Sequence, residues 1–159
     1  MGFRAALSAR RSRTSKEITG ATYQVLPSDH GKTLMLNRAA GMTLTLPADT
    51  TFVGFTVKMV VRDTFTGTWE VTCETDGDLF FGGVFLSSVA AKSDRFGPNG
   101  SSNDTLKVSS DSRGRLSGGF VNFTLMGPNE WLVDGVLAAG GTPVTPFADT
   151  QYLRGNNGI

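Results

Sequence analysis

The chain has 159 residues, a formal net charge of +1, 20 glycines, one cysteine and one histidine. A single cysteine excludes an internal disulfide and a cysteine-based zinc site, and a single histidine removes most metal and acid–base sites, so we expect no cofactor and no enzyme. No apolar run approaches the roughly 20 residues of a membrane-spanning helix, and the basic N-terminus lacks the apolar stretch of a signal peptide. We therefore expect neither a membrane protein nor export by that route.

Charge is distributed unevenly along the chain. The first sixteen residues hold five basic side chains and no acid, whereas the remainder holds ten basic and fourteen acidic residues. A segment of charge +5 before a body of charge −4 predicts an extended N-terminal arm, residues 1–19, that becomes ordered against an acidic partner. A solvated, frayed terminus is the alternative. The candidate partner-binding residues of this arm are Arg4, Arg10, Arg11, Arg13 and Lys16.

From Thr22 onward, apolar and polar residues alternate with a period of two, which is typical of β-strands. Met42–Leu46 alternates strictly until a proline stops it, and residues 55–61 and 69–74 repeat the pattern. Turn-forming residues separate these runs at roughly ten-residue spacing, as in antiparallel sandwiches and barrels. The pattern predicts an all-β fold, an antiparallel, jelly-roll-like β-sandwich over residues 20–138.

The second half of the chain is less regular. Residues 85–89 fit either a strand or a short turn of helix, and the Gly-, Asn- and Ser-rich residues 93–103 predict a surface loop. Residues 120–126 and 131–137 predict the two strands of a hairpin. The Gly- and Pro-rich residues 139–159 predict a tail that lies along another surface rather than folding by itself.

Three short polar motifs resemble parts of known functional sites, but none of them has the residues or spacing that such a site requires. Gly31-Lys32-Thr33 resembles the end of a phosphate-binding loop, but Leu26 stands where the first glycine is required and a strand follows instead of a helix. Ser28-Asp29-His30 holds the residue types of a catalytic triad, but neighbours in one turn cannot converge in triad geometry. Asp76-Gly77-Asp78 lacks a third carboxylate at calcium-loop spacing, so a plain β-turn is preferred. We expect no catalytic and no metal site.

The cysteine and the tryptophans are expected inside the protein. Cys73 shares a face with Trp69 and Val71 in the alternation, which favours a buried, unreactive thiol. Trp69 and Trp131 could form platforms on which a sugar ring stacks, but core packing is the preferred interpretation.

We expect the body not to bind nucleic acid. The body is net acidic and offers no basic strand face with interleaved aromatic residues. The basic arm alone would bind phosphates weakly and without sequence preference.

The body resembles a β-sandwich module that recurs in virion proteins of tailed phages. The module opens with the pattern Y-x-V, D-x-G-K-T-L and T-x-T-L-P followed by a glycine, which corresponds to residues 23–25, 29–34, 43–47 and 54. Its closing hairpin, G…V-x-x-x-L…W-x-V-x-G, is similar to Gly119, Val121, Leu125 and residues 131–135. The resemblance covers about residues 20–138 and leaves the arm and the tail outside it.

This resemblance implies a structural protein of the virion, a capsid decoration (cement) protein that binds and braces the phage head shell. Its partner would be the major capsid protein, it would form a homo-oligomer, often a trimer in such families, and it would be made in the host cytoplasm and reside on the capsid surface. No membrane partner is implied.

Two alternatives remain open. The module also occurs in tail and fibre proteins, so the chain could bind a glycan of the host surface through Trp69 or Trp131. A glycan hydrolase that uses two carboxylates is disfavoured, because no pair of carboxylates stands out.

Overall fold

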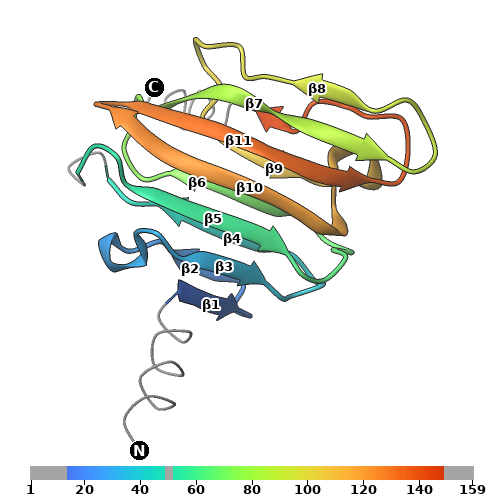
Figure 1. The fold of residues 1–159 in the computed structure, drawn as a ribbon, viewed down its shortest axis with the longest axis horizontal. Coiled ribbons are helices and arrows are strands. Elements are labelled where there is room, and N and C mark those ends of the chain that lie inside the picture. Colours follow the sequence, from blue (N-terminus) through green and yellow to red (C-terminus); the bar gives the residue numbers. More distant parts are fainter. Residues whose placement is uncertain (1–13, 49–51, 149–159) are drawn as a thin grey trace, which may run out of the picture.

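The computed structural model of the chain describes residues 14–48 and 52–148, which form two β-sheets packed face to face (Figure 1). Two short 3-10 turns interrupt the strands, η1 (Pro27–Asp29) and η2 (Asp111–Arg113). The expected all-β sandwich is confirmed. Within the two described ranges, no helix is long and apolar enough to cross a bilayer.

The larger sheet has seven strands in the spatial order β1 (Ser15–Ile18), β3 (Thr33–Leu36), β5 (Thr56–Val61), β10 (Leu116–Gly127), β11 (Glu130–Ala139), β7 (Leu79–Ser88) and β8 (Asp94–Phe96). The smaller sheet has five strands in the spatial order β12 (Phe147–Ala148), β9 (Thr105–Val108), β6 (Trp69–Cys73), β4 (Met42–Leu46) and β2 (Thr22–Gln24). The expected hairpin of the second half is formed by β10 and β11, and residues 85–88 belong to a strand, β7.

The first six strands alternate between the two sheets along the chain. Consequently β1, β3 and β5 are neighbours in the larger sheet, and β2, β4 and β6 are neighbours in the smaller one, all paired in parallel. The antiparallel, jelly-roll-like arrangement expected from the sequence is therefore corrected, because both sheets are mixed. In the larger sheet, β10 lies between β5 and β11 and runs antiparallel to both, β8 runs antiparallel to β7, and β11 and β7 pair in parallel. In the smaller sheet, β9 runs antiparallel to β6 and β12.

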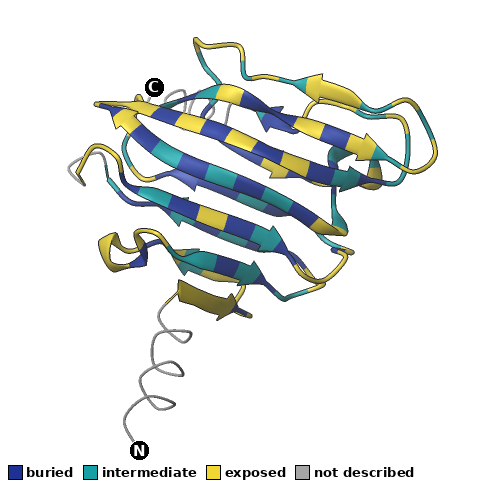
Figure 2. Cartoon of the chain, in the orientation of Figure 1, coloured by how far each residue is buried: buried dark blue, intermediate teal, exposed yellow. Residues whose placement is uncertain are grey.

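The core lies between the two sheets and follows the alternation of the sequence. In β4, for example, every second residue is buried, and Figure 2 shows the same alternation along β10 and β11. The side chains that fill the space include the largest apolar residues of the chain, each 0% exposed: Trp69, Trp131, Phe55, Phe65, Phe80 and Phe123. Burial of these rings on both inner faces holds the sheets together.

Three short strands lie in segments for which the sequence predicts no strand. β1 lies in residues 1–19, the expected arm, and pairs with β3 at the edge of the larger sheet. β12 lies in residues 139–159, the expected tail, and pairs with β9 at the edge of the smaller sheet. β8 lies at the start of the expected loop 93–103 and pairs with β7. The sandwich therefore includes parts of both terminal segments.

Candidate functional site

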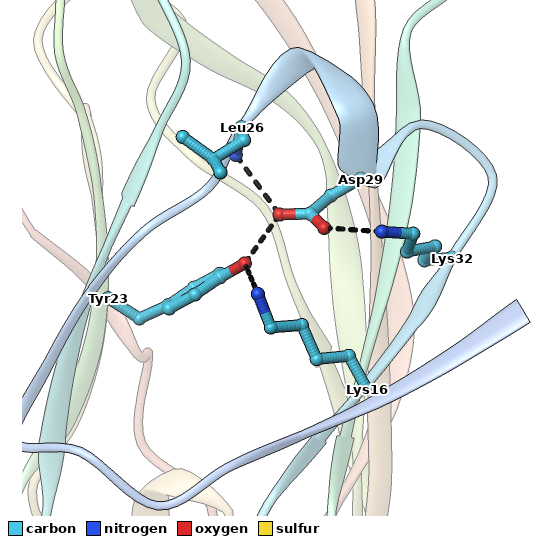
Figure 3. A network of polar contacts seen from close by, with 5 residues as sticks. All are labelled: Lys16, Tyr23, Leu26, Asp29 and Lys32. Carbon is cyan, nitrogen blue, oxygen red and sulfur yellow. Dashed lines mark hydrogen bonds and ion pairs between the residues drawn. The ribbon is translucent and has the colours of Figure 1, made fainter. Parts of the chain in front are cut away.

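A polar network joins η1 to the first strands of both sheets (Figure 3). At its centre is the Asp29 carboxylate, which is 1% exposed. Its Oδ2 accepts hydrogen bonds from the Tyr23 hydroxyl at 2.6 Å and the Leu26 amide at 3.1 Å, and its Oδ1 accepts one from Lys32 Nζ at 3.0 Å. Because Tyr23 is on β2 and Lys32 directly precedes β3, one carboxylate connects the two sheets.

The network stabilises Asp29 as a carboxylate and Tyr23 as a neutral phenol. Burial of Asp29 favours its neutral form, but the hydrogen bonds from Tyr23, Leu26 and Lys32 and the Lys32 charge outweigh it and hold the pKa of Asp29 below its usual value. Burial, together with the hydrogen bond to Asp29 and its negative charge, raises the pKa of Tyr23. The site is thus preorganised to hold chain segments together by charge-assisted hydrogen bonds.

Lys16 is the one predicted partner-binding residue that the structure describes. It is on β1, donates a hydrogen bond from Nζ to the Tyr23 hydroxyl at 2.7 Å, and lies 4.6 Å from the centroid of the Tyr23 ring. Its ammonium therefore attaches β1 to β2 and extends the Asp29 network. The four predicted arginines, Arg4, Arg10, Arg11 and Arg13, lie outside the described residues.

Glu17 forms a second attachment of β1 to the larger sheet. Its Oε1 accepts hydrogen bonds from Arg62 Nη1 at 2.7 Å and from the Asn37 side chain. Arg62 and Glu17 are both about half exposed, so this ion pair by itself contributes little to stability. Together with the parallel pairing to β3, the Lys16 and Glu17 contacts attach β1, the described strand of the expected arm, to the sandwich.

The polar motifs of the sequence have structural partners. Lys32 of the Gly31-Lys32-Thr33 motif binds Asp29, and Thr33 begins a strand, in agreement with the rejection of a phosphate loop. In Ser28-Asp29-His30, the His30 Nδ1 accepts a hydrogen bond from the Thr56 amide at 3.1 Å, whereas Asp29 binds Tyr23 and Lys32. The acid and the imidazole thus serve different contacts, and the interpretation as a polar turn is confirmed.

The tryptophans are both 0% exposed, so the core-packing interpretation is confirmed and neither ring forms a surface platform. Trp131 donates a hydrogen bond from Nε1 to Asp78 Oδ2 at 3.1 Å, which also gives the Asp76-Gly77-Asp78 turn a structural role. Cys73 is 4% exposed, as expected. Burial, together with the negative charges of Asp78 and Asp104, raises the pKa of its thiol. In the described ranges, no three His, Cys, Asp or Glu residues are grouped so as to hold a metal ion.

The outer face of the larger sheet carries apolar residues that the sequence interpretation overlooked. Phe85 is 40% exposed, and Leu132 and Val136 are each 36% exposed. Their signal is present in the sequence, because they occupy the solvent-facing positions of strands whose other face is already apolar. What the sequence does not show is that strand register places Phe85 beside Val136 and Leu132 beside Phe81.

Comparison with models of protein families finds no match to this chain, and comparison with curated proteins finds no similar sequence.

Proposed function

We propose that this chain is a structural protein of a tailed-phage virion, a capsid decoration protein that binds the major capsid protein on the head shell and braces it. Its role would be mechanical rather than enzymatic, and its place would be the capsid surface after synthesis in the host cytoplasm. The proposal begins from the resemblance of residues 20–138 to virion β-sandwich modules.

The observation that carries the proposal is the position of the two terminal strands. β1 forms the outer edge of the larger sheet beside β3, and β12 forms the outer edge of the smaller sheet beside β9 (Figure 1). In the smaller sheet, β12 is at one end of the strand order, and β2, which Lys16 links to β1, is at the other. Segments that continue from opposite edges of a rigid sandwich are suited to contact two different neighbours, as a bracing protein must.

The contacts of the motif residues also support this role. Tyr23, Asp29 and Lys32 belong to the phage-like pattern, and they join with Lys16 to attach β1 to the body. Force applied to the arm would therefore be transmitted to both sheets. Basic side chains of the arm would supply charge-assisted contacts to an acidic shell surface, and several weak contacts on one chain would add up to stable attachment.

The test replaces Arg4, Arg10, Arg11 and Arg13 together by glutamine and measures binding to purified head shells by co-sedimentation. Substitution is preferable to deletion of the whole arm, because Lys16 and Glu17 belong to β1 and their removal would disturb the sandwich. We expect shell affinity to fall at least tenfold, with an unchanged thermal unfolding curve. Wild-type binding should also weaken as salt is added.

The matched control replaces the same four arginines by lysine, which preserves the charge and should retain most of the binding. Equal shell occupancy of the glutamine variant and the wild type would contradict the role of the arm. Absence of wild-type binding to shells, combined with binding of the chain to a glycan array, would favour the tail or fibre alternative instead.

A further inference from the structure

Strand register assembles a continuous apolar row on the outer face of the larger sheet. Residues from strands distant in the sequence are paired side by side, from β3 through β5, β10 and β11 to β7: Met35, Val60, Phe120, Val136 and Phe85. All five are at least partly exposed, with Val136 at 36% and Phe85 at 40%. A sheet face normally exposes polar residues when its other face forms the core. An apolar row on the outer face therefore indicates a surface that binds a partner.

The two ends of this row carry opposite charges. Glu17 on β1, whose carboxylate also binds Arg62, is paired with Met35 at one end, and Arg95 on β8 is paired with Phe85 at the other. Both side chains are exposed. The Arg95 guanidinium reaches Gly83 on β7, because a Cβ placed on Gly83 would be 3.3 Å from its Nη2.

The adjacent row on the same face also carries opposite charges, on the two strands next to β10. Lys58 on β5, Asn122 on β10 and Asp134 on β11 are paired side by side. Lys58 and Asp134 are exposed, and Lys58 Nζ lies 4.6 Å from the centroid of the Phe120 ring. In both rows, therefore, opposite charges lie on opposite sides of β10.

We propose that a second copy of this chain covers this face, related to the first by a two-fold axis that runs along β10 in the plane of the interface. This rotation keeps each row facing itself and exchanges the two sides of β10. Asn122 then faces Asn122 of the second copy, Lys58 faces Asp134, and Glu17 faces Arg95, while Met35 faces Phe85. The face is complementary to itself in both charge and apolar character, as a two-fold interface requires.

The charge pattern selects this axis over the other in-plane axis. A two-fold axis along the rows, perpendicular to the strands, would place Glu17 against Glu17 and Arg95 against Arg95. Like charges facing each other across an interface are unfavourable, whereas the axis along β10 places opposite charges together. Two sheets related in this way pack with nearly aligned strands, which is the common geometry of stacked sheets.

The size of the face is sufficient for a specific, modest dimer. A third row on this face, Thr56, Thr124, Leu132 and Phe81, lies on the other side of the Lys58 row. Seven strands at about 4.8 Å spacing are about 29 Å across, and the three rows with their side chains cover about 20 Å along the strands, so each copy contributes roughly 600 Å². The total of roughly 1,200 Å² is at the lower end of specific interfaces. We therefore expect a dimer that dissociates on dilution. The pairing involves Glu17 of β1 but none of the four arginines that the shell-binding test replaces, so different variants test the two proposals.

The first test measures the mass of the full chain by sedimentation over a range of concentrations. We expect a monomer–dimer equilibrium, and Val136→Lys should weaken it at least tenfold while leaving thermal unfolding unchanged, since this side chain is already partly exposed. A Lys58→Asp variant should also weaken the dimer, and the combination of Lys58→Asp with Asp134→Lys should restore it. A stable trimer, as the phage resemblance implies, or a monomer at all concentrations would overturn the proposal.

The second test is disulfide trapping across the two-fold axis. Asn122→Cys should form a cross-linked dimer on mild oxidation, because the axis places this residue opposite itself. Lys107→Cys, an exposed position on β9 of the other sheet, is the matched control and should remain uncross-linked, and the native Cys73 is buried. Cross-linking through residue 107 alone would assign the contact to the wrong sheet. A monomer whose shell binding is abolished by Val136→Lys would assign the face to the shell instead of a second copy.

Discussion

Replacement of Asp29 by asparagine removes the charge at the centre of the network while preserving the shape of the side chain. If the amide oxygen takes the place of Oδ2, the Leu26 amide and the Tyr23 hydroxyl keep their acceptor, and the contact with Lys32 is lost. A hydrogen bond to a charged group contributes about 1.5–3 kcal/mol. Lys32 is 26% exposed and regains water, so we expect a loss near the lower limit, about 1.5 kcal/mol.

The assay is urea unfolding of the wild type and the variant at neutral and acidic pH. A loss of about 1.5 kcal/mol corresponds to a decrease of about 5 °C in the melting temperature of a domain of this size. The folded pKa of Asp29 lies below its unfolded value, so its contribution to stability is present above the unfolded pKa, about 3.9. That contribution is lost as the pH falls through the folded pKa. The difference between the two proteins should therefore be largest near neutral pH and become smaller in acid.

The matched control is Asp111→Asn, which breaks an ion pair with Arg115 at the surface. The Asp111 side chain is 52% exposed, so we expect a loss of less than about 1 kcal/mol. Equal losses for the two substitutions, or an Asp29→Asn difference that stays constant as the pH falls, would refute the assignment of Asp29 as the centre that joins the two sheets.

Two further predictions concern the core. Trp131→Phe should lower the free energy of unfolding by about 1.5–3 kcal/mol more than Trp69→Phe. Both rings are fully buried beside another aromatic ring, but only Trp131 donates a hydrogen bond to the buried Asp78. Equal unfolding free energies of the two variants would contradict this role of the hydrogen bond. At pH 8, Cys73 should react with a thiol reagent at least about 100-fold more slowly in the folded protein than in urea. Burial raises the pKa of the thiol and blocks access of the reagent to it. Rapid labelling of the folded chain would show that this end of the core opens.

Much of the fold could be predicted from local pattern. Alternation with a period of two identified β4, β5, β6 and the β10–β11 hairpin, because the residues that face the core recur at every second position in any strand with one buried face. The same pattern placed Cys73 and Trp69 inside. The short strands β1, β8 and β12 were missed because strands of four, three and two residues have too few apolar positions for a period to be detected.

The direction of strand pairing could not be predicted in the same way. Parallel and antiparallel neighbours share the period of two, and each of the first six strands pairs with a strand two places away in the chain rather than with the next one. Pairing with the next strand is the usual expectation for short connections, so the sequence favoured an antiparallel sheet. Which strands are neighbours depends on how the chain closes both sheets over one core.

For the candidate sites too, local pattern predicted some features and strand pairing decided the others. The sequence by itself determined the strand character of the body, the buried positions of its rings and thiol, and the contrast between a basic N-terminal segment and an acidic body, since these depend on residue type and local spacing. Only the tertiary structure decided that Tyr23, Asp29 and Lys32 meet Lys16, and that Glu17 and Arg95 lie at the two ends of one apolar row. The physical reason is that such contacts depend on the register of strands far apart in the chain, where a shift of one residue would turn the same side chains to the opposite face.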